Sequence, residues 1–175
     1  MRKKFIVDAN VFVQGKNLHY HFDFCQGFWD WIHTGYDQGV LYSIAKVKAE
    51  LVAGNKGDKG RSWAEAMPLD FFFEDTSDAK VMKAYAEIMN WSSGNDHYSK
   101  KAKDTFAEAK RADAFLLACA KAHGYVIVTQ EKSNPSQKSN IPIPDAASLI
   151  GGIPPTITIY ELLRLHAQPT FLFKP

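Results

Sequence analysis

Cysteine is scarce in this chain of 175 residues. The two cysteines present, Cys25 and Cys119, lie far apart and belong to no closely spaced pair. A disulfide framework or a cysteine-based zinc site requires several cysteines at short, regular spacings, so we expect neither of them. Unpaired cysteines are typical of a reducing compartment, and we therefore expect the protein to be cytoplasmic.

Long apolar runs are also missing. No stretch reaches the roughly 18 apolar residues that a membrane-spanning helix needs. The basic start of the chain is similar to the beginning of a signal peptide, but Asp8 and Asn10 interrupt the apolar segment that would have to follow it. The sequence therefore predicts no membrane partner.

A strong charge of either sign is absent as well. The formal net charge is +2, which permits nucleic acid as a partner without requiring it. The chain is 46% apolar and 13% aromatic, a composition typical of a globular protein. Its length suits one domain over residues 1–175, and we find no internal repeat.

Short apolar segments alternate with segments of helical periodicity. The expected strands are Phe5–Val7, Val40–Tyr42, Leu69–Phe73, Tyr125–Val128 and Thr156–Tyr160. The expected helices are 27–38, a helix capped by Ser43 and stopped at Gly54, 61–66, a helix from Thr76 or Ser77 to Asn90, 103–123 and 161–166. This alternation predicts an α/β fold, a three-layer sandwich around a mostly parallel sheet.

Two carboxylates follow apolar strands directly. Asp8 ends the first strand, and Glu131 comes shortly after Val128. In open α/β sheets, ligands bind at the carboxyl ends of the strands. From this pattern alone, Asp8 is either a structural cap of the next turn or the first ligand of a metal site.

Two further carboxylates lie on predicted helices. Glu50 borders the apolar face formed by Val47 and Leu51, where an exposed, solvated Glu is the simple interpretation. Asp113 lies within the apolar stripe of the helix predicted over 103–123. A salt bridge to Arg111 is the structural alternative for Asp113, but residues two apart in a helix do not face each other. The pattern therefore favours a functional role.

The four carboxylates would repel one another if the fold brought them together. Because the sequence offers no buried Lys or Arg to match them, a divalent cation is the natural partner. Oxygen ligands suit Mg²⁺ or Mn²⁺ better than zinc. Such ions bind phosphate oxygens and activate water for an in-line displacement.

The ordered combination of these segments resembles the PIN-domain nucleases, and more narrowly an uncharacterised PIN-like group related to VapC-type toxins. The similarity extends from Lys4 to about Tyr160. It is carried by FIVDANVF at residues 5–12, the helix with Ser43, Val47, Glu50 and Leu51, RADAFLLA at 111–118, VIVTQE at 126–131, and Ile143-Pro144-Asp145.

The resemblance implies a role for each matching position. Asp8, Glu50 and Asp113 match the three core acidic positions, and Thr129 matches a threonine at the end of the fourth strand. Glu131 stands where the family commonly has Asp, Asp145 is its rival as the fourth metal ligand, and Asn10 is a polar contact. A five-stranded sheet in the order 3-2-1-4-5 is also implied.

The function implied by the resemblance is that of a Mg²⁺- or Mn²⁺-dependent endoribonuclease, the toxin of a type II toxin–antitoxin pair. RNA is then the substrate, and Asp8, Glu50, Asp113 and Glu131 are the catalytic carboxylates. A protein antitoxin is the expected partner, and a homodimer is compatible with this interpretation.

Three alternatives stay open. A haloacid-dehalogenase-like phosphatase requires a second aspartate at the position of Asn10. A zinc site at His19 and His21 has no nearby cysteine pair to complete it. A catalytically silent PIN-like domain would only bind RNA or a partner. For RNA binding, basic side chains offer phosphate contacts and two tryptophans offer stacking surfaces; they are Lys100, Lys101, Lys103, Lys110 and Arg111, and Trp63 and Trp91. A solvated face for the charged residues and core packing for the tryptophans are the commoner explanations, so we do not include them in the site.

Overall fold

A parallel four-stranded sheet forms the centre of the molecule in the computed structural model, which describes residues 3–174. The strands are β1 (Phe5–Val7), β2 (Leu41–Ile44), β3 (Phe72–Phe73) and β4 (Val126–Val128). They lie in the order β3-β2-β1-β4, and each neighbouring pair is parallel. The predicted α/β class with a parallel sheet is thereby confirmed.

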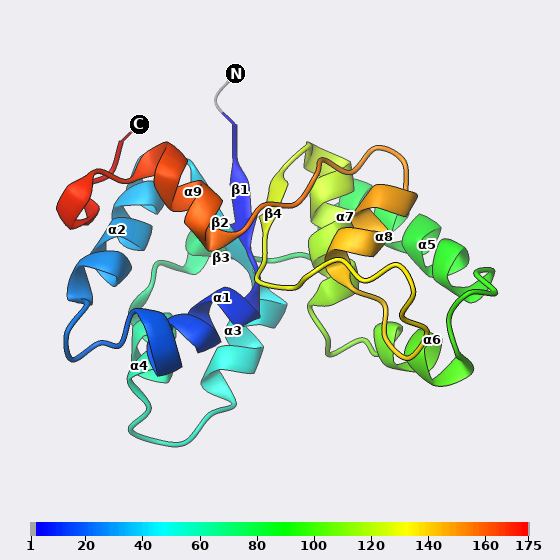
Figure 1. The fold of residues 1–175 in the computed structure, drawn as a ribbon, viewed down its shortest axis with the longest axis horizontal. Helices are drawn as coiled ribbons and strands as arrows, with labels where there is room; N and C mark the ends of the chain where they lie inside the picture. The colour runs from blue at the N-terminus through cyan, green and yellow to red at the C-terminus, as the bar shows by residue number, and fades with distance from the viewer. Residues whose placement is uncertain (1–2, 175) are drawn as a thin grey trace.

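Helices flank this sheet on both sides. Helices α2 and α9 lie on one side, and α5, α7 and α8 lie on the other (Figure 1). The α-helices are α1 (Ala9–Gln14), α2 (Gln26–Asp37), α3 (Ala45–Val52), α4 (Lys59–Ala66), α5 (Ala79–Ser93), α6 (Lys100–Phe106), α7 (Asp113–His123), α8 (Ile143–Leu149) and α9 (Ile159–His166). A π-helical turn at Gly15–His19 and 3₁₀ turns at Leu69–Phe71 and Pro169–Phe171 complete the set.

Strand β1 is the middle of this arrangement. It is buried along its whole length and pairs with β2 on one side and with β4 on the other. A strand covered on both faces is expected to read as a continuous apolar run, as Phe5–Val7 does. Because β1 and β4 are parallel neighbours, the residues that follow them emerge side by side at one edge of the sheet.

The long helix predicted over residues 103–123 is wrong. The structure has two helices there, α6 and α7, with a turn at 107–112 between them. The predicted apolar stripe is broken because Ala109 is exposed, as are its neighbours Glu108 and Lys110. Asp113 is consequently the first residue of α7, where the helix dipole favours a negative charge.

The last predicted strand, Thr156–Tyr160, is also wrong in extent. Only Ile157 makes a parallel bridge, to Val128 on the free side of β4. The side chain of Thr158 accepts a hydrogen bond from the backbone of Glu161, and the Glu161 side chain accepts one from the backbone of Thr158. This capping box starts α9 and overrides the apolar alternation of the segment.

Three smaller predictions also need correction. Ser43 is not a helix cap: it lies within β2, and its hydroxyl donates a 2.6 Å hydrogen bond to the carbonyl oxygen of Val7. The third strand is shorter than the predicted Leu69–Phe73, since residues 69–71 form a 3₁₀ turn before β3. Helix α5 is capped by Asp78 instead of Thr76 or Ser77.

The core joins all layers of the fold. Buried apolar side chains from the strands and from α2, α5 and α7 form one contiguous cluster. Within residues 3–174 no helix has both the length and the apolar character needed to cross a membrane.

Candidate functional site: an acidic cluster at the carboxyl edge of the sheet

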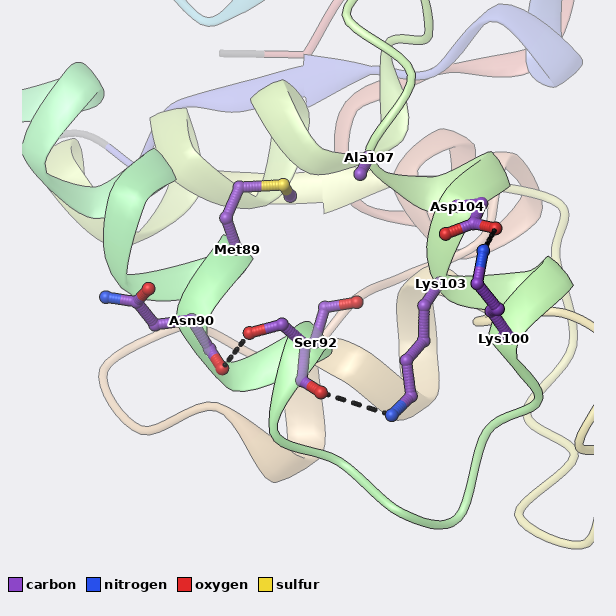
Figure 2. Close-up of a pocket in the computed structure, with 8 residues that line it drawn as sticks. Met89, Asn90, Ser92, Lys100, Lys103, Asp104 and Ala107 are labelled. Carbon is purple, nitrogen blue, oxygen red and sulfur yellow. Dashed lines mark hydrogen bonds and ion pairs between the residues drawn. The ribbon is translucent and has the colours of Figure 1, made fainter.

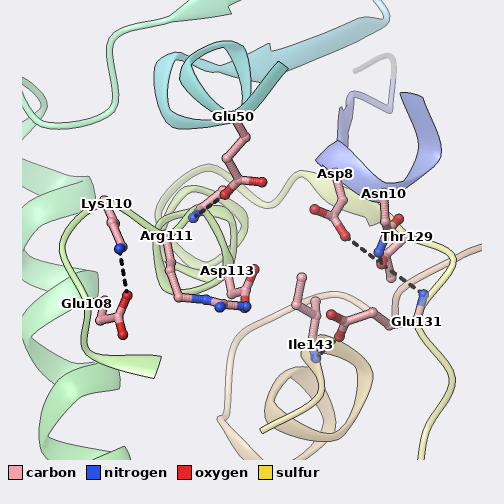
Figure 3. A network of polar contacts seen from close by, with 11 residues as sticks. Asp8, Asn10, Glu50, Glu108, Lys110, Arg111, Asp113, Thr129, Glu131 and Ile143 are labelled. Atoms are coloured by element: carbon pink, nitrogen blue, oxygen red, sulfur yellow. Dashed lines mark hydrogen bonds and ion pairs between the residues drawn. The ribbon is translucent and has the colours of Figure 1, made fainter. Parts of the chain in front are cut away.

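The carboxyl ends of β1 and β4 join three polar side chains. The Thr129 hydroxyl donates a 2.8 Å hydrogen bond to Oδ2 of Asp8, which is only 4% exposed. The Asn10 side-chain amide donates to the same hydroxyl oxygen over 3.0 Å, and its own oxygen accepts the backbone N–H of Gln130. Asn10 and Thr129 therefore hold the Asp8 carboxylate in one orientation (Figure 3).

Helix α3 brings Glu50 to the start of α7. Its Oε1 accepts a 3.2 Å hydrogen bond from the backbone N–H of Ala112, the residue before Asp113. Burial raises the pKa of Glu50, although the residue as a whole is exposed. The two observations agree because the carboxylate is partly surrounded by other residues while the rest of the Glu50 side chain is exposed to water. Glu50 is therefore not the freely solvated side chain that its position alone suggested.

Asp113 lies between Glu50 and the end of β4. Contrary to the expectation from helix spacing, Arg111 does pair with it, over 3.3 Å between Nη2 and Oδ2. The spacing rule fails because Arg111 precedes α7 and does not have to follow helical geometry. The Asp113 side chain is 16% exposed and that of Arg111 is 41% exposed, so this cation reaches the site from its open side.

Glu131 enters from the loop that follows β4. Its Oε2 accepts a 2.7 Å hydrogen bond from the backbone N–H of Ile143, the first residue of α8. Its own backbone N–H donates to the Thr129 hydroxyl oxygen over 3.1 Å. Glu131 is thus held through its backbone and through its carboxylate, and its side chain is directed toward the other carboxylates (Figure 3).

Asp145, the rival of Glu131 for the fourth position, is used differently. Its Oδ1 accepts a 2.5 Å hydrogen bond from the Ser133 hydroxyl, and its Oδ2 accepts the backbone N–H of Asn134 over 2.9 Å. Both oxygens of this buried side chain therefore fix the loop after β4. The geometry favours Glu131 over Asp145 as the fourth carboxylate of the site.

The carboxylates of Asp8, Glu50, Asp113 and Glu131 form what we call the acidic cluster. In each of them the contacts above engage a single oxygen, and among residues 3–174 the second oxygen has no hydrogen-bond or ion-pair partner. Figure 3 shows the four side chains around a common space. The cluster thus presents four oxygen donors that the rest of the described chain does not use.

The charges of the cluster act on one another. The pKa of Asp8 is raised to about 8, and burial is the largest cause. The charges of Asp113, Glu131 and Glu50 contribute to the rise, and the hydrogen bond from Thr129 opposes it. Burial is also the largest cause of the raised pKa of Glu131, to which Asp113 adds. Such mutual repulsion at the edge of a sheet is typical of functional sites.

The donor set fits Mg²⁺ or Mn²⁺ in its chemistry, since both prefer carboxylate oxygens. The distances are wider than ligation requires, because no three His, Cys, Asp or Glu side chains in the described part of the chain stand close enough together to hold a metal ion. An ion at this place would have to draw the carboxylates inward. The same finding gives no support for zinc at His19 and His21.

Two of the lysines that offer phosphate contacts, Lys100 and Lys103, make contacts within the chain. A hollow of about 500 Å³ lies between the end of α5 and α6, and none of the cluster carboxylates lines it (Figure 2). At its rim Lys100 pairs with Asp104 over 2.6 Å, and Lys103 donates to the carbonyl oxygen of Ser93 over 3.1 Å. These exposed contacts are weak, so the phosphate role stays a prediction.

The tryptophans suggested as stacking surfaces pack among other rings. Trp63 lies 5.1 Å from Phe12 and 4.9 Å from Trp29 between ring centroids, and it is partly buried against the apolar core. Trp91 packs edge-on to Tyr98 at 6.2 Å. Core packing therefore accounts for Trp63.

Sequence reasoning missed the backbone donors of the site and its cation. The N–H groups of Ala112 and Ile143 carry no signal in the sequence, since every residue except proline has one. Arg111 was considered as an ion-pair partner of Asp113 and rejected because of the helix spacing, so its place in the site was missed.

Comparison with known proteins gives a family without an assigned activity. No curated protein matches the chain. The model of the family described as "Domain of unknown function (DUF4411)" matches residues 5–169, which include the whole acidic cluster. Because this match covers nearly all of the sequence, the chain belongs to the DUF4411 family.

Proposed function

We propose that this protein is a metal-dependent endoribonuclease of the PIN-like type, with the acidic cluster as its active site. The observation that carries the proposal is the arrangement of Asp8, Glu50, Asp113 and Glu131. They come from four separate segments, and each leaves one carboxylate oxygen without a partner among the described residues. Folding gathers repelling charges at a cost, and a divalent cation would compensate it.

Each residue has a defined part in this proposal. The four carboxylates would hold Mg²⁺ or Mn²⁺, while Thr129 and Asn10 keep the Asp8 carboxylate in place. The bound ion would polarise a phosphate oxygen and make water a better nucleophile. Glu131, anchored by the N–H of Ile143, is the fourth donor we propose.

The topology supports the PIN-like assignment in part. The order β3-β2-β1-β4 agrees with the first four strands of the expected order 3-2-1-4-5. The bridge between Val128 and Ile157 lies on the side of β4 where the fifth strand would be. We therefore propose that residues near Ile157 occupy the place of the fifth strand.

The wider biological role follows from the resemblance alone. We propose that the protein is the toxin of a type II pair in the cytoplasm, with a protein antitoxin that restrains it and with RNA as substrate. A homodimer is compatible with this role. Production of the wild-type protein should then stop growth of a bacterial host, and Asp8→Asn should relieve the arrest.

One observation favours a second function, a silent RNA- or partner-binding domain. Arg111 pairs with Asp113 and so supplies part of the charge compensation that an ion would give. The phosphatase alternative loses support, because the Asn10 amide is engaged by Thr129 and Gln130 and is oriented for positioning.

An assay with purified protein separates the two functions. Incubated with a single-stranded RNA in millimolar Mn²⁺, the protein should produce internal cleavage fragments, and excess EDTA should stop the reaction. RNA binding without cleavage over a range of RNA sequences would favour the silent domain. A preparation of Asp8→Asn, purified in the same way, controls for contaminating ribonuclease.

A further inference from the structure

A cation, the Arg111 side chain, lies next to the acidic cluster. The Arg111 guanidinium lies 3.3 Å from Oδ2 of Asp113, and the pair is reached by solvent because the Arg111 side chain is 41% exposed. In Figure 3 the Arg111 side chain extends alongside Asp113, below Glu50. It is held by a single contact, which is a loose arrangement for a side chain with five N–H donors.

The charge of Arg111 acts on more than its direct partner. It lowers the pKa of Glu50 and that of Glu131, opposing the effect of burial on both. Arg111 therefore contacts Asp113, and its positive charge also acts on Glu50 and Glu131, which reduces the repulsion within the acidic cluster in the metal-free protein.

We propose that Arg111 is an exchangeable counter-cation: it compensates the acidic cluster while no ion is bound, gives up Asp113 to a divalent ion, and then contacts an RNA phosphate. This inference rests on the proposed function. The ion pair is open to solvent on its Arg111 side and rests on one 3.3 Å contact, so it can be displaced. A guanidinium also has the fork geometry that suits a phosphate group. The same side chain would thus serve the empty and the loaded states of the site.

The neighbouring Lys110 provides a matched control. It carries the same charge one position earlier, its side chain is 84% exposed, and its ion-pair partner is Glu108 at 3.5 Å. Lys110 therefore tests the general effect of removing one positive charge from this turn, without touching the pair with Asp113.

The first experiment measures Mn²⁺ affinity by titration calorimetry at low salt. Arg111→Gln should bind Mn²⁺ more tightly than wild type, on the order of tenfold, because a positive charge that competes for Asp113 is gone. Arg111→Lys should bind like wild type, and Lys110→Gln should change the affinity much less. Equal affinities of Arg111→Gln and wild type would overturn this inference alone. Absence of Mn²⁺ binding by wild type would overturn the proposed function and this inference with it.

The second experiment needs no metal. RNA affinity is measured in EDTA by fluorescence anisotropy with a short single-stranded oligonucleotide. Asp113→Asn removes the partner of Arg111, so Arg111→Gln should cost severalfold more RNA affinity in the Asp113→Asn background than in wild type. Lys110→Gln should cost the same in both backgrounds. Equal costs of Arg111→Gln in the two backgrounds would show that Asp113 does not restrain Arg111 and would contradict the proposal. Circular dichroism of each variant verifies that it is folded.

Discussion

Two buried aspartates follow strands of the same sheet, and their surroundings differ. Asp8, after β1, is 4% exposed, accepts the Thr129 hydroxyl at 2.8 Å and faces three other carboxylates. Asp75, two residues after β3, is 1% exposed, and among the described residues neither of its oxygens has a hydrogen-bond partner of good geometry. The nearest cation of Asp75 is Lys46, whose Nζ lies 3.9 Å away.

Burial raises the pKa of both carboxyls, so burial does not distinguish them. What differs is the sign of the surrounding charge. The charge of Lys46, which also lies 4.1 Å above the Phe115 ring, opposes the rise in the pKa of Asp75. No cation among residues 3–174 opposes the rise in the pKa of Asp8. Asp8 thus has an excess of negative charge around it and a carboxylate held in one orientation, as the proposed ion site requires. A single buried carboxylate beside a lysine is better explained as structure.

Substitution at the two places should separate them most strongly in RNA cleavage. Asp8→Asn and Asp113→Asn should each lower the cleavage rate in Mn²⁺ by about 100-fold or more, since they remove proposed metal ligands. RNA binding should persist, because phosphate contacts come from basic groups. Asp75→Asn should cleave within about twofold of wild type, as its role is structural. Wild-type rates in both cluster variants would remove the acidic cluster from the mechanism.

The pH dependence of stability should differ as well. Asp8 has a folded-state pKa of about 8, above its ordinary value of 3.8, so the folded state binds more protons between these pH values. Stability in EDTA should therefore fall as pH rises from about 4 to about 8. Asp8→Asn removes this penalty, which is on the order of 5 kcal/mol near pH 8, and its amide oxygen can still accept the Thr129 hydroxyl.

Thermal melts in EDTA at pH 5 and pH 8 measure this effect. The melting temperature of Asp8→Asn should exceed that of wild type at pH 8, and the difference should shrink at pH 5. A variant that melts below wild type at both pH values would instead identify Asp8 as a structural cap of the turn after β1.

Addition of Mn²⁺ should stabilise the protein through the cluster. An ion present at 100 times its dissociation constant adds about 2.7 kcal/mol, which corresponds to several degrees in the melting temperature of a domain of this size. Asp75→Asn should keep the shift and Asp8→Asn should lose most of it. If neither Mn²⁺ nor EDTA changes the melting curve of wild type, the metal site is disproved.

The smallest effect is expected at Asp75 itself. Asp75→Asn should raise the free energy of unfolding by less than about 1 kcal/mol, because it removes a buried charge whose oxygens have no hydrogen bond. Lys46 is 19% exposed and keeps its contact with the Phe115 ring, so it is not left as a buried, unpaired charge. Chemical denaturation at pH 7 measures the change, and a loss of several kcal/mol would show that the pair with Lys46 is a strong one.

The sequence by itself determined the strands at the centre of the sheet and the residues that follow them. Phe5–Val7 and Val126–Val128 are continuous apolar runs, as is typical of short strands that are buried on both faces. Their parallel pairing then places Asp8 and Thr129 side by side. For these residues local pattern and fold agree, so they could be predicted.

Tertiary structure alone decided the rest of the site. The helix break at 107–112 depends on which alanines are buried against other elements, and Ala109 is exposed. Because of that break, Asp113 is the first residue of α7, and Arg111, which lies outside the helix, can pair with it. The choice between Glu131 and Asp145 depends on the backbone N–H of Ile143 and on the loop at Ser133. The N–H of Ile143 is a group that every residue except proline carries, and the pairing of Ser133 with Asp145 depends on how the loop folds, so no pattern in the sequence records these contacts.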